Sequence, residues 1–524
     1  MAQTIDAKTL RQWLYGGGEL ALLDVREVGQ MVLGHILFSA PLPYSRFEID
    51  LPRLVPNPSV RVVLCDNGDG IAAKAAARAE SMGYGHVAVL EGGVGSWQAA
   101  GHTLYEGVNV PSKAFGELVE HAADTPRLPA AEIAERSARG ADMVIVDGRP
   151  LEEFAKMNIP GAECCPNGEL ALRVGEFAPN PETTIIVNCA GRTRSIIGAQ
   201  TLIDMGVPNP VFAMENGTQG WVLAGLELER GASGTLPGVP AEPAEERAKA
   251  SDLAALHGVE TVTPETLSGW LTDQTRTTYL LDVRTAEERA NDPETRRAVL
   301  ARHGVGHAPG GQLVQATDQW IGVRSARIVV LDTESVRAPV VAAWLRRLGH
   351  MAYTLAVGID ALAGVQASTG QLTSGLPALP AITAQDLASR LTEVRMLDLR
   401  SSTDYRAGHI DGAIWTKRPV LPDRSDPTVL IADSPEIAQL AALDLRERGC
   451  TEATLLAGGS DQWAEAGLNL ITTPDIPTDA ERIDFLSFTH GRHAGNLDAS
   501  RQYLAWEIAL VDQLDADERA VFRI

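Results

Sequence analysis

One short pattern recurs four times along the 524-residue chain and limits its fold more than any other feature. It is an apolar run that ends in Asp-x-Arg, with its aspartates at Asp24, Asp147, Asp282 and Asp398. Successive copies are separated by about the length of a small domain. A repeat of this kind predicts a chain of tandem domains rather than one large core.

Each copy continues in the same way. A Gly-containing loop leads to a second apolar strand, a helical pattern closed by a glycine, a third strand and a Gly-containing turn. The second strands end at Cys65, Cys189, Asp332 and Asp433. Alternating strands and helices predict an α/β fold in each copy, a parallel sheet with helices on both faces, and place ligands at the carboxyl ends of strands.

The second copy carries a distinctive loop at this point. It runs Cys189, Ala190, Gly191, Arg192, Thr193, Arg194, Ser195, and a helical pattern begins within it. Backbone N–H groups in a tight loop and at a helix N-terminus carry partial positive charge, and the two arginines add full charges. The thiolate, which is the nucleophilic form of cysteine, is favoured there. Cys189 is therefore the predicted nucleophile.

The other residues of this loop are predicted to bind the substrate. Gly191 allows the backbone to turn tightly and approach a ligand. Thr193 and Ser195 either donate hydroxyl hydrogen bonds to the ligand or cap the helix. Arg192 either contacts the site or points to solvent.

The other three copies lack this combination. Cys65 is followed by Asp66 and Asp69, whose charges disfavour a thiolate. The third copy has Asp332 in place of the cysteine but keeps Arg337, and the fourth has Asp433 and no arginine. We therefore expect one catalytic domain, at 127–233, and three inactive ones at 1–110, 258–372 and 380–472. Cys65 is an outside candidate for a relay thiol.

The linkers and the end of the chain follow from composition. Pro/Gly-rich stretches at 234–243 and 374–380 are predicted linkers, and a first boundary is expected between residues 107 and 126. The tail at 473–524 departs from the repeat and is predicted to be helical, with an amphipathic helix from about residue 499 to 515. Its His490 and His493 are expected to be loop residues, so no metal site and no cofactor is predicted.

Charge and cysteine content exclude several classes of function. A formal net charge of -23 argues against a nucleic-acid or anionic-membrane partner. The N-terminus lacks a basic region followed by an apolar core, and no long apolar stretch follows, so a cytoplasmic protein is expected. Five sparse cysteines predict reduced thiols rather than a disulfide framework. The adjacent Cys164 and Cys165 are predicted to be a packed loop pair.

The repeated elements resemble rhodanese domains, and the whole chain resembles a four-domain rhodanese-related sulfurtransferase. The resemblance is carried by the Asp-x-Arg strand, the Ile159-Pro160-Gly161-Ala162 loop, the strand ending at Cys189 and the turn from Gly92 to Trp97. It implies that Cys189 takes a sulfane sulfur from a donor such as thiosulfate. The cysteine then holds this sulfur as a persulfide and passes it to cyanide or a thiol.

Two arginines have predicted roles in this chemistry. Arg194 would hold the departing sulfite, and it lies five positions after Cys189, whereas thiol phosphatases on similar scaffolds place their arginine at the sixth position. The smaller ring favours sulfur over phosphate. Arg149 ends the Asp-x-Arg pattern of the same copy and either reaches the anion from across the sheet or only pairs with Asp147.

A second hypothesis belongs to a different class of function. The chain would then be a non-catalytic sulfur carrier, or a docking scaffold for a partner enzyme of sulfur metabolism, with Cys189 as the carrier thiol. A homodimer is a further open alternative. The sequence leaves the physiological donor and acceptor undetermined.

Overall fold

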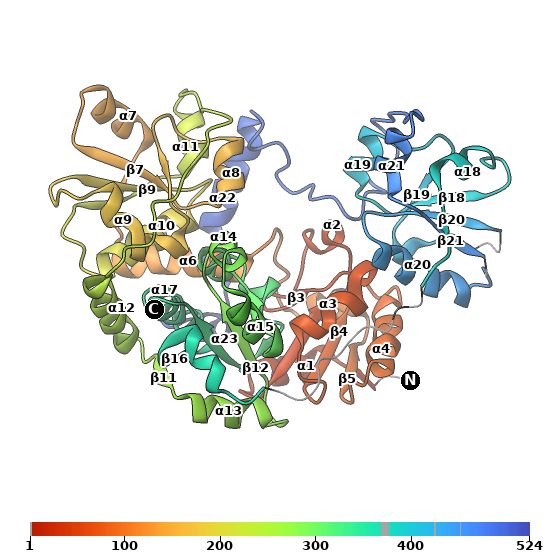
Figure 1. Cartoon of the computed structure of the whole chain (residues 1–524), viewed down its shortest axis with the longest axis horizontal. Helices are drawn as coiled ribbons and strands as arrows, with labels where there is room; N and C mark the ends of the chain where they lie inside the picture. The colour runs from red at the N-terminus through yellow and green to blue at the C-terminus, as the bar shows by residue number, and fades with distance from the viewer. Residues whose placement is uncertain (1–2, 368–375, 377, 424–425, 451) are drawn as a thin grey trace. The chain divides into compact units, whose positions relative to one another are not determined.

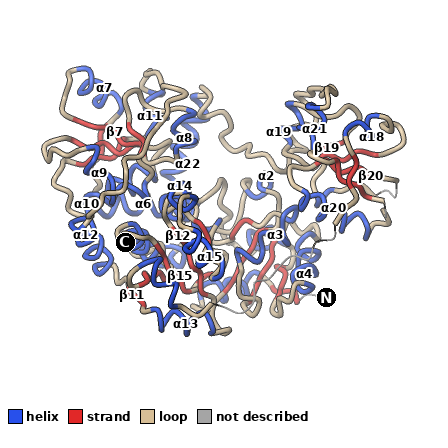
Figure 2. Tube along the Cα trace, in the orientation of Figure 1, coloured by secondary structure: helices blue, strands red, loops and turns tan. Residues whose placement is uncertain are grey.

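The computed structural model describes residues 3–367, 376, 378–423, 426–450 and 452–524 (Figure 1). These residues contain four sheets, each flanked by helices, which confirms the predicted fold class (Figure 2). The boundary expected at residue 372 lies outside the described residues, as do residues 374, 375 and 377 of the expected linker. In the described part of the chain, no helix is long and apolar enough to cross a membrane.

The five strands of each domain are arranged in one shared order, and their pairings are parallel. Numbered within each domain, the order is first, fifth, fourth, second, third. The strands of the first domain are β1 (Gln3–Ile5), β2 (Leu20–Asp24), β3 (Ala40–Pro41), β4 (Arg61–Cys65) and β5 (Val87–Leu90). Those of the second are β6 (Arg127–Leu128), β7 (Met143–Asp147), β8 (Glu163–Cys164), β9 (Thr184–Asn188) and β10 (Val211–Met214). Those of the third are β11 (Glu260–Val262), β12 (Thr278–Asp282), β13 (Gly306–His307), β15 (Arg327–Leu331) and β16 (Met351–Leu355). Those of the fourth are β17 (Ala381–Ile382), β18 (Arg395–Asp398), β19 (Ile414–Trp415), β20 (Thr428–Ile431) and β21 (Ala453–Leu456).

Helices fill the connections between these strands. The first domain contains α1 (Ala7–Tyr15), α2 (Val28–Met31), α3 (Phe47–Leu54), α4 (Ile71–Ser81) and α5 (Gly93–Ala99). The second contains α7 (Ala130–Ala138), α8 (Leu151–Lys156), α9 (Asn167–Phe177), α10 (Thr193–Asp204) and α11 (Gly217–Leu223). The third contains α13 (Pro264–Thr272), α14 (Ala286–Ala290), α15 (Glu294–Arg302), α16 (Gly310–Gln315) and α17 (Arg337–Arg347). The fourth contains α18 (Ala384–Ala388), α19 (Ser402–Ala407), α20 (Pro435–Glu447) and α21 (Gly459–Glu465). Outside the domains lie α6 (Val110–Ala123), α12 (Ala244–Leu256), α22 (Leu497–Gln513) and α23 (Ala516–Val521).

The central strand β9 shows why these runs are apolar throughout. Ile185 and Val187 pack in one core with the helix residues Leu170 and Leu202, whereas Ile186 packs in a second core on the other face. A strand covered by helices on both faces has no polar side, so its sequence is a continuous apolar run rather than an alternating one.

The described residues form two compact units. The first unit holds the fourth domain and the first domain apart from Trp13–Leu20. Within it, Nη2 of Arg418 donates to Oε1 of Glu48 at 2.7 Å. The second unit holds the second and third domains together with α6 and the C-terminal segment Thr489–Ile524. There Nε1 of Trp344 donates to Oγ1 of Thr201 at 2.9 Å. Domains that are neighbours in sequence are therefore not always partners in packing.

Candidate active site

Cys189 lies where the sequence places it, directly after β9 and before α10. The residue is 2% exposed. Its Sγ accepts a hydrogen bond from Oγ of Ser195 at 3.1 Å, so Ser195 contacts the predicted nucleophile directly. Because α10 begins at Thr193 and runs for 12 residues, its positive N-terminal end faces this loop.

The turn between β10 and α11 fixes the loop through its carbonyl groups. The N–H of Thr218 donates to the carbonyl of Cys189 at 2.8 Å, and Nε2 of Gln219 donates to the carbonyl of Ala190 at 3.0 Å. Gly217 has a φ of +54°, and a Cβ there would lie 2.2 Å from the Cys189 oxygen. Only glycine fits at this approach, which explains the Gly-containing turn of the repeat.

The same turn identifies the positions equivalent to Cys189 in the other domains. The N–H of Val94 donates to the carbonyl of Asp66, and the N–H of Ile359 to that of Asp332, as Thr218 does to Cys189. In the fourth domain a Cβ on Gly459 would lie 3.1 Å from the oxygen of Ala432. The structure thus places Asp66 and Ala432 at the nucleophile position, one residue away from the Cys65 and Asp433 that the sequence alignment suggested.

This shift in register follows from where each strand ends. Cys65 is the last residue of β4, as Asn188 is of β9, and both lie inside the sheet rather than in the loop. Burial, followed by the negative charge of Asp24, raises the pKa of the Cys65 thiol well above its usual value. Cys65 therefore cannot take the place of Cys189 within the first domain.

The aspartates of the first and third domains show which backbone groups converge on this loop position. The Asp332 carboxylate accepts backbone N–H groups from Ser335, Val336 and Ala338 at 2.9 to 3.1 Å. The Asp66 carboxylate accepts three more, at 2.8 to 3.1 Å, from Gly68, Gly70 and Ala72. Three converging N–H donors form a cradle for an anion, and in the second domain Cys189 occupies the position of the two aspartates.

Arg194 is close to the loop but is already held by a carboxylate. Its Nη1 and Nη2 donate to the two oxygens of Glu153 at 2.8 and 2.9 Å. Burial disfavours the charged Glu153, but these hydrogen bonds outweigh burial and lower its pKa. In the third domain Arg337 bonds Glu288 in the same way, although that domain has no cysteine. The Arg–Glu pair is thus shared by a loop that has the thiol and one that lacks it.

Arg192 points neither to solvent nor to the sulfur. Its Nε and Nη2 donate to the carboxylate of Glu117 at 2.7 and 2.8 Å, and Nη2 also donates to Glu120. Burial disfavours the charged guanidinium, but the two carboxylates outweigh it and raise the pKa of Arg192. Both acids belong to α6, which lies in the stretch where the sequence predicted only a domain boundary. The Arg192 side chain therefore joins the loop to α6 through these hydrogen bonds, and its guanidinium is not free for a substrate.

Arg149 is 0% exposed and pairs with Asp147, which was one of its two predicted roles. Its Nε and Nη2 donate to the Asp147 carboxylate at 2.8 and 2.7 Å. The same pair forms at Arg26, Arg284 and Arg400. One difference remains: within the described residues Nη1 of Arg149 has no partner, whereas Nη1 of Arg26 donates to Asn67 in its loop. The ion pair is part of the fold, and the Nη1 donor of Arg149 has no acceptor among the described residues.

The C-terminal segment also lines this site, which sequence reasoning did not foresee. Oγ1 of Thr193 donates to Oε1 of Glu507 at 2.6 Å, and a Cβ on Gly191 would lie 3.1 Å from both Glu507 and the ring of Tyr503. The guanidinium of Arg492 lies 4.4 Å from the centre of that ring. The only sequence signal for these contacts was the amphipathic pattern of the helix, which shows a buried face but not what covers it.

The remaining cysteines are packed in cores. Cys164 ends β8, and burial followed by the charge of Asp147 raises its pKa to about 12. Burial also raises the pKa of Cys165 above its usual range, and Cys450 is buried in the fourth domain. Of the five cysteines, Cys189 is the one at the loop position where the first and third domains hold an aspartate.

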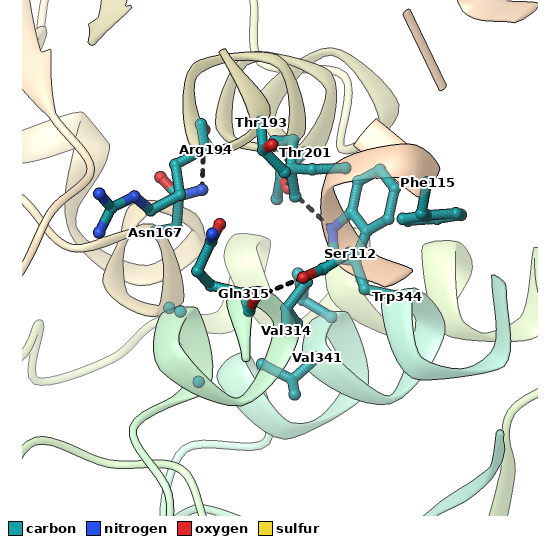
Figure 3. A pocket seen from close by; sticks show the side chains of 15 residues that line it. Ser112, Phe115, Asn167, Thr193, Arg194, Thr201, Val314, Gln315, Val341 and Trp344 are labelled. Atoms are coloured by element: carbon teal, nitrogen blue, oxygen red, sulfur yellow. Dashed lines mark hydrogen bonds between the residues drawn. The ribbon is translucent and has the colours of Figure 1, made fainter. Parts of the chain in front are cut away.

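A small cavity lies behind α10, between the second and third domains (Figure 3). Thr193, Ile197 and Thr201 line it from α10, and Val341 and Trp344 line it from α17. Its volume of about 20 Å³ is enough for roughly one water molecule. Thr193 and Arg194 of the loop line it, but Cys189 does not.

These observations define a class of protein: tandem parallel α/β domains, one of which has a thiol at the strand end where two others hold an aspartate bound by backbone N–H groups. The family model of the rhodanese-like domain matches residues 6–100, 129–224 and 383–466, which is more than half of the chain. The chain therefore belongs to the family of proteins with rhodanese-like domains, which confirms the resemblance. The third domain lies outside the matched residues but has the same strand order.

Two individual proteins show how far the similarity extends. The crystal structure of a thiosulfate sulfurtransferase from Pseudomonas aeruginosa superposes with a TM-score of 0.89 at 37% identity, over 100% of this chain and 99% of that one. The HTH-type transcriptional regulator Rv0324 of Mycobacterium tuberculosis is 32% identical over 102 residues, which is 20% of this chain and 44% of that protein. The chain thus matches less than half the length of the regulator.

Proposed function

We propose that this protein is a sulfurtransferase with one working site, at Cys189 in the second domain. The thiolate attacks the sulfane sulfur of an anionic donor such as thiosulfate, expels sulfite and holds the sulfur as a persulfide. A thiophilic acceptor, cyanide or a thiol, then takes the sulfur from Cys189. Membership of the rhodanese-like family and the similarity to a thiosulfate sulfurtransferase support this activity.

The observation that carries the proposal is the cradle itself. In the first and third domains three backbone N–H groups converge on an aspartate carboxylate at the position of Cys189. In the second domain the same loop position holds a thiol, so equivalent donors can stabilise a thiolate or a persulfide anion. Preorganised donors of this kind lower the barrier of a step in which negative charge moves between sulfur atoms.

The loop residues then have separate tasks. Ser195 hydrogen-bonds the sulfur, and Gly191, Ala190 and Thr193 shape the cradle through their backbone. Arg194 and the open Nη1 of Arg149 provide positive charge for the leaving sulfite. Arg192 acts at a distance, by holding the loop against α6.

The other three domains serve this site without chemistry of their own. Asp66, Asp332 and Ala432 stand where Cys189 stands, and none of them can carry a persulfide. A sulfur-carrier or docking role for the whole chain is the alternative. It predicts that Cys189 accepts sulfur but that the chain does not turn over with small acceptors.

One assay decides between these functions. Sulfite release from thiosulfate is followed with cyanide or glutathione as acceptor, for the natural chain and for Cys189→Ser. We expect sustained turnover that the substitution abolishes. Persulfide formation on Cys189 without turnover would favour the carrier function, and absence of both would refute the proposal.

A further inference from the structure

The helix α22 brings a carboxylate to the Cys189 loop from more than 300 residues away in the sequence. Helix α22 packs against α6 in the second unit (Figure 1). Glu507 lies on its buried face and is 1% exposed. Oε1 accepts the hydroxyl of Thr193 at 2.6 Å, and Oε2 lies 3.1 Å from where a Cβ on Gly191 would be. The carboxylate therefore touches the cradle loop at two of its residues.

The second oxygen of this carboxylate differs from those of the acids around it. Glu117 bonds Arg192 with both oxygens, and Glu153 bonds Arg194 with both. Oε2 of Glu507 is buried, and no described residue gives it a hydrogen bond. A buried carboxylate oxygen without a donor is costly, so its place at the loop is best explained by a donor that arrives with a ligand.

The chemistry of the two half-reactions decides which ligand this is. An anionic donor such as thiosulfate has no proton to offer, and the Glu507 charge repels it. A thiol acceptor brings an S–H group that must lose its proton before or during attack on the persulfide. On the basis of the proposed function, we propose that Glu507 accepts this proton and is a catalytic residue for sulfur transfer to thiols.

The atoms, electrons and proton of this step are all accounted for. The acceptor sulfur forms a bond to the terminal sulfur of the Cys189 persulfide, while the bond between that sulfur and Sγ breaks. The electron pair of the broken bond returns to Sγ, which leaves as the thiolate. The thiol proton moves to Oε2 of Glu507 and passes from there to water. The products are a thiolate on Cys189 and a persulfide of the acceptor, with no net oxidation.

Other groups near the loop are less suited to this role. Burial, followed by the charge of Glu507, raises the pKa of Tyr503 well above its usual value, so this phenol keeps its proton at neutral pH. Arg492 is a cation and cannot accept a proton. His493 is the nearest rival, because burial and then Arg492 lower its pKa to about 4 and leave it neutral. Among the described residues, no hydrogen bond joins His493 to the loop.

The test separates the half-reactions in the full-length protein. Cys189 is first loaded with thiosulfate, and sulfite release is measured. The persulfide is then discharged either to 2-mercaptoethanol, which carries an S–H proton, or to sulfite at a pH where sulfite carries none. For Glu507→Gln we expect discharge to the thiol to slow by about a hundredfold, the usual scale for losing a general base. Discharge to sulfite and loading with thiosulfate should not slow, because the variant removes a negative charge from the path of an anion.

Two further variants complete the experiment. Asp512→Asn removes one exposed carboxylate from the same helix and should leave every step unchanged. Glu507→Asp keeps a carboxylate and should transfer to the thiol faster than Glu507→Gln, a comparison that holds even if either variant is less stable.

Several results would overturn the proposal. Equal slowing of all three steps by Glu507→Gln would make Glu507 a positioning residue that only holds Thr193. Unchanged transfer to the thiol, or loss of that transfer in His493→Gln instead, would exclude Glu507 as the base. Glu507 would also be excluded as the base if the natural chain forms the persulfide and transfers its sulfur to sulfite but never to thiols. Failure of the natural chain to release sulfite at all is a different result, since it refutes the sulfurtransferase function itself.

Discussion

The loops that follow β9 and β15 have the same place in their domains and differ at their first residue. Both contain an arginine five positions on, Arg194 or Arg337, bonded to a glutamate of the helix that follows the Asp-x-Arg strand, α8 or α14. One loop begins with Cys189 and the other with Asp332, whose carboxylate takes three N–H groups of its own loop. The comparison teaches that the arginine is common to both loops, whereas the residue at the cradle position differs, and on the proposed function this difference separates a working site from a closed one.

The largest effect is expected when this difference is removed. Cys189→Asp copies the third-domain loop into the second domain. Sulfite release should be abolished, because no sulfur nucleophile remains, and the thermal midpoint should rise above that of Cys189→Ser, because a carboxylate can satisfy the N–H donors. Activity assays and thermal unfolding of both variants check this. A midpoint for the Asp variant below that of the Ser variant would show that the second-domain loop does not hold an anion as the third does.

The next largest effect tests whether Arg194 contributes to the use of thiosulfate, in addition to the ion pair with a glutamate that Arg337 also forms. Arg194→Ala removes a charge-assisted contact of about 1.5–3 kcal/mol and should weaken the use of thiosulfate by roughly tenfold to a hundredfold. Glu153→Gln is the matched control, since it releases the guanidinium and should not weaken the use of thiosulfate. Steady-state kinetics with varied thiosulfate measure both. Unchanged kinetics in Arg194→Ala would reduce Arg194 to the structural role of Arg337.

A smaller effect on activity is expected for Arg149, whose pair with Asp147 recurs in all four domains. Arg149→Lys keeps the charge but loses the planar two-point contact with the carboxylate. We expect a lowered thermal midpoint, together with a rise in the half-saturating thiosulfate concentration that is smaller than in Arg194→Ala. Comparison of the midpoint with the kinetics decides the matter. A normal midpoint with a large kinetic defect would instead make the open Nη1 of Arg149 a principal anion contact.

The smallest effect is expected for Cys65. Its thiol lies in the sheet of the first domain, and its pKa is raised chiefly by burial. Cys65→Ser should therefore leave sulfite release within about twofold of the natural chain, since it changes no group of the cradle. Turnover and persulfide formation on Cys189 are the measurements. A loss of turnover as large as that of Cys189→Ser would indicate a two-thiol relay. It would contradict the proposal of a single working site.

The residues that sequence alone could assign are those whose role depends on neighbours in the chain. The four apolar strands ending in Asp-x-Arg predicted four parallel α/β domains, and Cys189 with Gly191 predicted the loop. Such features depend on the local pattern of apolar residues and on local backbone shape, and a few consecutive residues determine both. Even here the sequence missed by one residue in two domains, because an apolar run does not show whether its last member, such as Cys65, lies in the strand or in the loop.

Tertiary structure decided which groups surround the sulfur. Arg192 looked like a substrate ligand, but a buried guanidinium must find carboxylates, and it finds Glu117 and Glu120 on α6. The pairing of the second domain with the third, and the return of α22 to the loop, join segments that lie far apart in the sequence. The sequence by itself determined the repeat and predicted the nucleophile, because both follow from local pattern. Only the packing of distant helices determined that Glu507 lies at Gly191. An amphipathic helix shows in its sequence that one face is buried, but not which other segment covers that face.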